Sequence, residues 1–169
     1  QLPTRWMDND QYGHMNNVIH YSLIDTAVTH WQLEQAVFDM SGTKTRFLVV
    51  ESGCIYHNEA GFPDLIHAGI RVGHIGTSSW RYEVGLFRNQ RQTAFAEGFF
   101  AQVQVESESG APLPLDPEFR RCVETLCPPE TLLYLDLLDC TACKNRSGIQ
   151  IKPFVKINAK PLSMFILHW

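Results

Sequence analysis

Residues 5–17 read Arg-Trp-Met-Asp-Asn-Asp-Gln-Tyr-Gly-His-Met-Asn-Asn, and this polar stretch stands immediately before an apolar pattern of helical period. It contains two carboxylates, Asp8 and Asp10, with an asparagine between them and a glycine shortly after. A carboxylate just upstream of a helix lies beside the N–H donors of the helix N-terminus, which suits attack on a carbonyl. Asp is also a common turn and capping residue, so a structural role competes with this one. The density of polar groups favours a functional site.

A long helix is predicted directly after this stretch. Apolar residues recur at steps of three and four from about residue 15 to residue 36, which is typical of one buried stripe on a helix. The stripe consists of Val18, Tyr21, Ile24, Val28 and Trp31. The residues that fall largely off it are His20, Thr26, His30 and Gln32.

Four strands and a short helix are predicted next, near residues 46–57, 66–73, 80–86, 95–105 and 117–126. The second and third strands alternate apolar and polar residues. The first strand has apolar residues at both parities, which predicts that both of its faces are covered. The connections between the strands are short, so the sheet should be antiparallel. The sequence therefore predicts an α+β fold in which the long helix packs on one face of an antiparallel sheet.

The composition indicates a globular protein of one domain. The chain has 169 residues, of which 44% are hydrophobic and 19% charged, values typical of a soluble domain with a substantial core. The formal net charge of −4 disfavours a general nucleic-acid binder. No apolar run in the sequence approaches the roughly 18 residues that a membrane span needs. Five cysteines without regular spacing argue against a disulfide framework and favour an intracellular location, either cytoplasmic or mitochondrial.

The organised pattern stops near residue 127. We assign residues 1–127 to one domain and residues 128–169 to an atypical C-terminal tail that packs on the domain or is partly disordered. Within the tail no period holds after Asp139. Cys140 and Cys143 have the spacing of metal ligands, but no second pair follows, so no metal site is expected.

The spacing Arg5-Trp6-x-Asp8-x-Asp10-x-x-Gly13-His14-x-Asn16-Asn17-x-x-x-Tyr21 resembles the opening motif of the 4-hydroxybenzoyl-CoA thioesterase family, one of the hotdog-fold acyl-CoA thioesterases. Residues 75–79 and 110–114 resemble later segments of that family. The resemblance covers about residues 2–127 and implies a hotdog fold, in which a curved antiparallel sheet wraps a long central helix. It also implies a thioesterase of lipid metabolism that hydrolyses an acyl-CoA without a metal or cofactor, and that works as a homodimer or homotetramer.

The resemblance also assigns the catalytic groups. The second carboxylate of the motif, Asp10, would attack the thioester to form a mixed anhydride or act as general base on water, and both routes stay open. Asp8 would bond backbone N–H groups in the turn. The backbone N–H of Asn17, seven residues after Asp10, would hold the oxyanion for about 3 kcal/mol of transition-state stabilisation. A thiolate leaves readily, so no strong general acid is needed.

Further residues are candidates for contact with the substrate, although each also suits a capping or turn-forming role. They are Gly13, His14, Asn16, Tyr21, Ser78 and Ser79. The coenzyme A phosphates would need basic partners, and most arginines on strands and turns are simply solvated. The candidates for this role are Arg71, Arg81, Arg88 and Arg91.

Two other functions are compatible with the same residues. A hydratase or dehydratase acting on enoyl or hydroxyacyl thioesters needs an acid/base pair, for which Asp10 and His14 are the nearby candidates. The second alternative function is that of a non-catalytic acyl-CoA-binding protein, which the atypical tail favours. A serine-triad hydrolase is not favoured, because the sequence lacks Gly-x-Ser-x-Gly.

Overall fold

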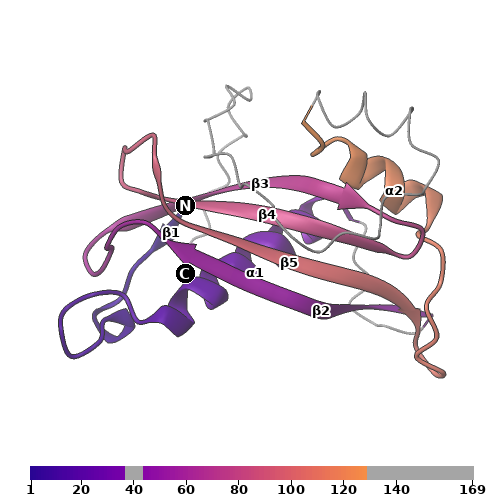
Figure 1. Cartoon of the computed structure of the whole chain (residues 1–169), viewed down its shortest axis with the longest axis horizontal. Coiled ribbons are helices and arrows are strands. Elements are labelled where there is room, and N and C mark those ends of the chain that lie inside the picture. Colours follow the sequence, from indigo (N-terminus) through magenta and orange to yellow (C-terminus); the bar gives the residue numbers. More distant parts are fainter. Residues whose placement is uncertain (37–43, 129–169) are drawn as a thin grey trace, which may run out of the picture.

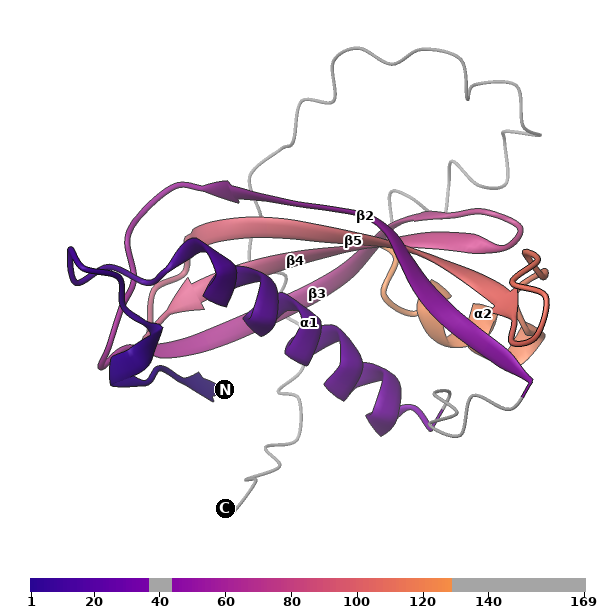
Figure 2. The same ribbon diagram turned by 90° about the horizontal axis from the view of Figure 1, so that it is seen from below.

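An antiparallel sheet curls around one long helix, and a short helix lies at one end of the sheet (Figure 1, Figure 2). The structure is a computed structural model that describes residues 1–36 and 44–128. The elements in chain order are β1 (Leu2–Pro3), the 3-10 helix η1 (Trp6–Asp8), α1 (Asn17–Glu34), β2 (Thr45–Tyr56), β3 (Leu65–Ile75), β4 (Ser79–Arg88), β5 (Ala94–Glu106) and α2 (Pro117–Glu124). The predicted order of helices and strands is confirmed.

The five strands form one sheet in the order β1-β3-β4-β5-β2, and every neighbouring pair is antiparallel. Among the described residues, β1 and β2 are therefore the two edge strands. Figure 2 shows α1 lying across the concave side of the sheet. The core fills the space between them, and its largest fully buried side chains include Trp80, Tyr82, Ile24 and Ile66. The predicted architecture, a curved sheet wrapped around a long central helix, is confirmed.

The short helix α2 is fixed near the end of β3. Asp116 caps its first turn by accepting the Glu118 N–H at 2.8 Å, and Pro117 is its first residue, as predicted. Phe119 packs against Trp80, with the ring centroids 4.6 Å apart. Figure 1 places α2 and the connection between β4 and β5 at opposite ends of the sheet.

The helix α1 begins and ends inside the predicted range of residues 15–36. Asn16 caps it by accepting the Val18 N–H at 3.2 Å. The predicted stripe is wrong at its first residue, because Val18 is 60% exposed. His20, predicted to fall off the stripe, is buried instead. The buried apolar face continues through Ile24, Val28 and Trp31, since the curved sheet contacts the helix along this row.

Gln32, also predicted to lie off the stripe, is buried too. Its side-chain amide donates to the Tyr82 hydroxyl at 3.2 Å and to Gln102 Oε1 at 3.0 Å. A buried amide costs little free energy when its hydrogen bonds are made inside the protein. The core therefore contains the polar Gln32, whose burial a pattern of apolar residues does not predict.

The strand β2 is not covered on both faces, contrary to the prediction. It lies at the edge of the sheet and pairs with β5 alone. Its large apolar side chains are at least 42% exposed at Leu48, Val49, Val50, Ile55 and Tyr56. Apolar residues at both parities usually indicate a strand between two layers, but in the described part of the chain no second layer covers β2.

The predicted tail lies outside the described residues except for Pro128, and so does the pair Cys140 and Cys143. The domain boundary at residue 127 stays a prediction. Within residues 1–36 and 44–128, no helix has the length and apolar character needed to cross a membrane.

Candidate functional site

The two aspartates of the opening loop have different surroundings. Asp8 is buried, and its carboxylate binds the Arg5 guanidinium at 2.8 Å and the Arg5 backbone N–H at 2.7 Å. Burial acts to raise the pKa of Asp8, but the hydrogen bonds and charge of Arg5 outweigh it and hold the pKa below its ordinary value. The Asp8 carbonyl also accepts the Asn16 N–H at 2.8 Å. Asp8 therefore ties the beginning of the loop to the helix cap.

Asp10 closes a tight turn with one carboxylate oxygen. Its Oδ1 accepts the backbone N–H groups of Tyr12 at 2.8 Å and of His14 at 3.1 Å. Gly13 completes the turn with a φ of +82°, in the left-handed region that favours glycine. Oδ2 accepts no hydrogen bond from the described residues. One oxygen of Asp10 is therefore available to a substrate or a water molecule.

The start of α1 supplies a backbone donor. Asn16 is the cap, and its side chain accepts the Val18 N–H. Asn17 is the first helical residue, so its N–H has no carbonyl one turn earlier to bind. No group in the described part of the chain accepts this N–H. The loop therefore ends, at the positive end of the helix dipole, on a donor that has no acceptor within residues 1–36 and 44–128.

A hollow of about 660 Å³ lies between this loop, α1 and the end of β2. Its wall is formed by residues 10–12, residues 14–17, His20, Tyr56 and residues 58–60. Four of the predicted site residues share this wall, namely Asp10, His14, Asn16 and Asn17. The hollow therefore brings the available oxygen of Asp10 and the start of α1 to one site.

The other predicted substrate residues do not line this hollow. Gly13 shapes the turn, and Tyr21 is half-buried on α1. Ser78 and Ser79 lie where β4 begins, and the Ser78 carbonyl accepts the Gln104 N–H at 2.8 Å. Within one copy of the chain, the two serines are therefore separated from Asp10.

The side chains of Asp10 and His14 do not form an acid/base pair. Asp10 binds only the backbone N–H of His14, and His14 Nε2 lies 3.4 Å from Glu59 Oε2. Both members of the His14–Glu59 pair are well exposed, so it contributes little to stability. The geometry of the described residues therefore gives no support to the hydratase interpretation.

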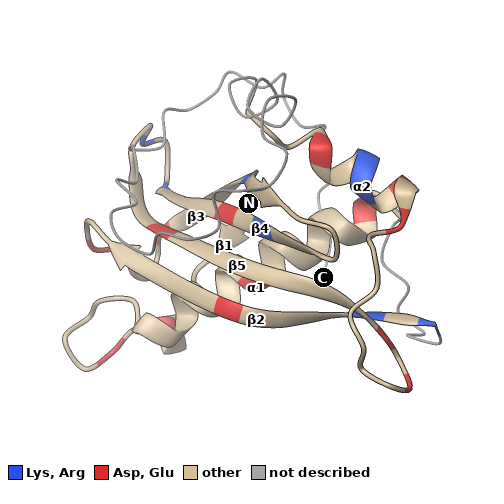
Figure 3. Ribbon diagram, turned by 45° about the vertical axis from the view of Figure 1, so that its right-hand side comes forward, with Lys and Arg blue, Asp and Glu red and all other residues tan. Residues whose placement is uncertain are grey.

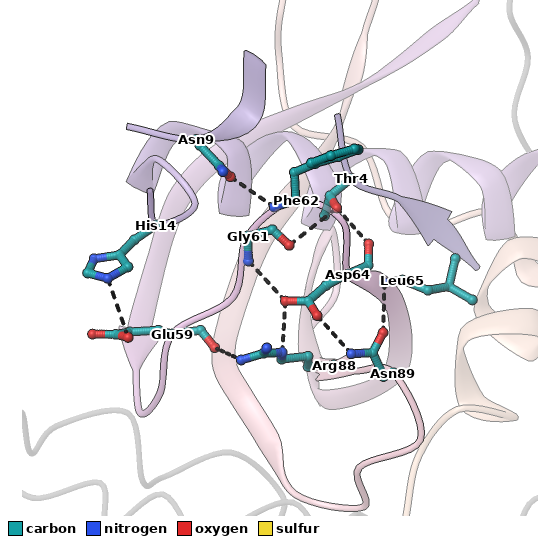
Figure 4. A network of polar contacts seen from close by, with 10 residues as sticks. All are labelled: Thr4, Asn9, His14, Glu59, Gly61, Phe62, Asp64, Leu65, Arg88 and Asn89. Carbon is teal, nitrogen blue, oxygen red and sulfur yellow. Dashed lines mark hydrogen bonds and ion pairs between the residues drawn. The ribbon is translucent and has the colours of Figure 1, made fainter. Parts of the chain in front are cut away.

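A second loop, residues 57–64, holds the opening loop in place (Figure 4). Asn9 Oδ1 accepts the Phe62 N–H at 2.9 Å. The Met15 N–H donates to the Ala60 carbonyl at 2.7 Å. These contacts on either side of the Asp10 turn fix its position against the sheet.

Asp64 is the buried carboxylate at the centre of the network in Figure 4. It accepts the Gly61 N–H at 3.1 Å, the Asn89 side-chain amide at 2.8 Å and Arg88 Nε at 2.7 Å. Burial acts to raise the pKa of Asp64, but Asn89, Gly61 and Arg88 outweigh it and keep the pKa below its ordinary value. The sequence indicates only a turn at residues 58–64, so this support of the site is a finding of the structure.

His20 is a buried residue of the hollow that was not among the predicted site residues. It is 5% exposed, and its ring meets Tyr56 edge-on at 4.8 Å and Phe95 at a tilted 5.7 Å between centroids. Its Nδ1 lies 3.3 Å from the Asn16 carbonyl oxygen, and burial lowers its pKa. The spacing of four residues from the capping Asn16 is the signal that places His20 on the site side of the helix.

A smaller hollow of about 350 Å³ adjoins the first, and the two share Asn58 and Glu59. Its wall also contains Arg88 and Arg91, from the end of β4 and the connection to β5. Arg88 is held by Asp64, whereas Arg91 is exposed and forms no ion pair with a described residue.

The other two candidate arginines lie elsewhere. Arg71 pairs with Glu83 at 2.6 Å. Arg81 lies 3.8 Å from Glu51 and stacks over the Phe99 ring at 3.4 Å. Neither arginine lines the two hollows.

The described residues hold no group of three or more His, Cys, Asp or Glu side chains placed to bind a metal ion. Their three cysteines, Cys54, Cys122 and Cys127, are free thiols. Burial raises the pKa of Cys54 and of Cys127. A thiol with a raised pKa stays protonated at neutral pH, so these two cysteines are poor nucleophiles.

Known proteins share this fold. The family model described as the Thioesterase-like superfamily matches residues 4–123. The PA5185 protein from Pseudomonas aeruginosa strain PAO1 has 40% sequence identity, with 76% of this chain and 90% of that chain covered and a TM-score of 0.72. A thioesterase from Thermus thermophilus, solved with coenzyme A and Zn, has 26% identity, with 74% of this chain and 90% of that chain covered and a TM-score of 0.63. The 1,4-dihydroxy-2-naphthoyl-CoA thioesterase from Synechocystis shows likeness of fold alone, with 11% identity, coverage of 73% of this chain and 93% of that chain, and a TM-score of 0.67.

The fold is therefore the hotdog fold of thioesterases. The chain belongs to the Thioesterase-like superfamily, whose model covers the opening loop, α1, the four long strands β2–β5 and most of α2. Among curated proteins, no match to the sequence is found.

Proposed function

We propose that this chain is an acyl-CoA thioesterase, which hydrolyses an acyl-CoA to a free acid and coenzyme A. The observation that carries the proposal is the hollow beside α1, whose wall contains Asp10 and Asn17. Among the described residues, one oxygen of Asp10 accepts no hydrogen bond and the Asn17 N–H has no acceptor. Membership of the superfamily supports it, as does the T. thermophilus thioesterase that was solved with coenzyme A. The opening motif leads us to group the chain with the 4-hydroxybenzoyl-CoA thioesterases.

The proposed reaction needs an attacking group, a stabilised oxyanion and a leaving group. The thioester carbonyl oxygen would accept the Asn17 N–H, which lowers the barrier by about 3 kcal/mol. Asp10 would attack the carbonyl carbon or take the proton of an attacking water. Coenzyme A would leave as a thiolate, and the parent thiol pKa of ~8.5 makes a strong general acid unnecessary. His14 and Asn16, on the same wall, would contact the bound thioester.

We assign the coenzyme A phosphates to the smaller hollow. It adjoins the proposed site of chemistry through Asn58 and Glu59, and a pantetheine arm could pass between the two hollows. Arg91 is the stronger candidate ligand, because it forms no ion pair with a described residue, whereas Arg88 is held by Asp64. The Glu59 carboxylate on the shared wall would have to turn toward His14 and away from the phosphates.

We further propose that two copies of the chain pair through β2, as a homodimer or as half of a homotetramer. This strand has 12 residues and an edge without a strand partner among the described residues. Figure 3 shows few charges along it, and Arg46 and Glu51 are its charged residues. A long apolar edge strand is a template for pairing with another strand. A second β2 would pair with the backbone groups of this edge, pack beside its apolar side chains and continue the sheet across the two copies.

Such pairing would give Ser78 and Ser79 a place near the site. Ser79 lies in register with Val103, and Val103 in register with Leu48, near the beginning of β2. The hollow lies at the other end of β2, at Tyr56. In an antiparallel pair, the beginning of one strand lies beside the end of the other. The serines of one copy would therefore approach the hollow of the other copy.

A panel of acyl-CoA thioesters, followed by release of free thiol, tests the proposed activity. We expect the substitution Asp10→Asn to lower kcat/KM by about 10²–10⁴-fold. The matched control is Asp25→Asn, an exposed aspartate on α1, which should retain the wild-type rate. An unchanged rate in Asp10→Asn would remove that residue from the chemistry. Binding of acyl-CoA without any thiol release by the wild type would favour the non-catalytic binding protein.

A further inference from the structure

We propose that His20 is a second proton acceptor of the site, whose Nε2 takes the proton of the water that completes the hydrolysis. The inference rests on the proposed thioesterase function and extends it to a residue outside the opening motif. His20 belongs to α1, one turn after the Asn17 N–H, and it forms part of the same hollow as Asp10.

The tautomer of His20 follows from its hydrogen bond. Nδ1 lies 3.3 Å from the Asn16 carbonyl oxygen. A carbonyl oxygen can only accept, so Nδ1 must carry the proton. Burial lowers the pKa of His20, which keeps the ring neutral at physiological pH. Nε2 therefore presents a lone pair that can accept a hydrogen bond or a proton.

The position of the ring is fixed on several sides. Nδ1 is directed at the backbone of its own helix, so Nε2, across the ring, lies on the side away from that backbone. Tyr56 meets the ring edge-on at 4.8 Å, and Phe95 lies 5.7 Å away. No described residue forms a hydrogen bond with Nε2. An almost fully buried, neutral base thus stands in the wall of the hollow, and its Nε2 has no partner in the described part of the chain.

The other titratable groups of the hollow are less suited to accept this proton. His14 is exposed, and its Nε2 lies near Glu59. Burial raises the pKa of Tyr56, so its phenol keeps its own proton. Glu59 and Tyr12 also line the hollow, but both side chains are well exposed to solvent. Asp10 is the remaining candidate, but it cannot act as a base while it forms part of an anhydride.

The need for a second base arises in the nucleophilic route. In the first step, an Asp10 oxygen bonds to the thioester carbon, the C–S bond breaks, and coenzyme A leaves with the electron pair as a thiolate. Asp10 is then an acyl anhydride without a negative charge. In the second step, water attacks the acyl carbon, its proton passes to His20 Nε2, and the bond to the Asp10 oxygen breaks to restore the carboxylate. The imidazolium then releases its proton to solvent.

Rapid mixing of enzyme with excess acyl-CoA separates the two steps, because thiol leaves in the first. We expect His20→Gln, which keeps a polar side chain but removes the base, to release close to one equivalent of thiol per site in a burst. Its steady rate should then be about 10²–10⁴-fold below that of the wild type. His30→Gln is the matched control, because His30 is a partly exposed histidine of the same helix and pairs with Glu34. The control should retain the wild-type rate.

A second variant, His20→Ala, opens space in the wall of the hollow. Added imidazole should raise its steady rate toward that of the wild type, and a far-UV circular dichroism spectrum like that of the wild type checks the fold. A wild-type steady rate in His20→Gln would overturn the inference. So would a slow His20→Gln without a burst, or a folded His20→Ala that imidazole does not rescue. If the wild type itself releases no thiol from any thioester, the proposed function fails, and this role of His20 fails with it.

Discussion

Replacement of Asp64 by Asn removes one charge from the network that supports the second loop of the site. The two side chains have nearly the same shape, so the substitution changes charge and hydrogen bonding while it preserves packing. All three partners of Asp64, the Gly61 N–H, the Asn89 amide and Arg88 Nε, are donors. An Asn side chain presents one oxygen and one NH₂ group. At least one of the three donors must then face another donor or lose its partner.

The size of the effect follows from these contacts. The ion pair with Arg88 contributes little, because that side chain is 36% exposed and its charge is screened by solvent. The bonds from Gly61 and Asn89 are made to a buried charge, and such bonds contribute about 1.5–3 kcal/mol each. The Asn oxygen would keep one of them as a weaker, neutral hydrogen bond. We therefore expect Asp64→Asn to lower the free energy of unfolding by about 2–3 kcal/mol at pH 7.

Urea unfolding at a series of pH values measures this loss. The pKa of Asp64 is lower in the folded protein than in the unfolded chain. Its contribution to stability is therefore complete above the unfolded pKa of about 3.9 and is lost as the pH falls through the folded pKa. The wild type should lose stability below about pH 4, and Asp64→Asn should lose less over that range. The two stability curves should converge in acid.

The control for this experiment is the exposed Asp25, whose replacement by Asn should shift stability by no more than about 0.5 kcal/mol. Asp8 also has a lowered pKa, but it is present in both proteins and cancels from the comparison. A difference between wild type and Asp64→Asn below about 0.5 kcal/mol at pH 7 would refute the reasoning. A difference that persists unchanged in acid would refute the electrostatic part of it.

Three further perturbations test other parts of the molecule. Gly98→Ala would place a methyl group against Ile24 and should lower the free energy of unfolding by about 1–3 kcal/mol. Urea unfolding measures this loss, and a stability like that of the wild type would contradict the packing of α1 on β5. Arg91→Ala should raise KM for acyl-CoA and leave KM for the matching acyl-pantetheine unchanged, because acyl-pantetheine lacks the phosphates. The control is Arg121→Ala, at the α2 end of the sheet, and an equal effect of Arg91→Ala on both substrates would argue against a phosphate role. Val50→Lys should shift the protein to monomer in sedimentation velocity, and a monomeric wild type would count against pairing through β2.

Local sequence patterns, which involve residues a few positions apart, predicted most of the fold. The limits of α1, the four long strands and the cap at Asp116 follow from periodicity and capping chemistry, which act over a few residues. The opening motif likewise predicted that Asp10 and the start of α1 would share one site, and the hollow contains both.

The errors arose where distant segments decide the outcome. The side of α1 that is buried depends on the curvature of the sheet, so Val18 is exposed and His20 is buried. The prediction for β2 failed because strand order, which the sequence pattern does not specify, places it at the edge of the sheet. The contacts of Asp64 with Asn89 join residues 25 positions apart, and no local pattern indicates them.

The opening loop shows how geometry separates two residues of the same chemistry. Both oxygens of Asp8 bind Arg5, one through the guanidinium and the other through the backbone N–H. A carboxylate held in this way would have to break an ion pair before it could attack a substrate. Asp10 uses one oxygen to close its turn, which fixes the carboxylate without occupying the other oxygen in the described structure. Orientation by one oxygen and availability of the other are both required of an attacking group, and of these two aspartates only Asp10 meets them.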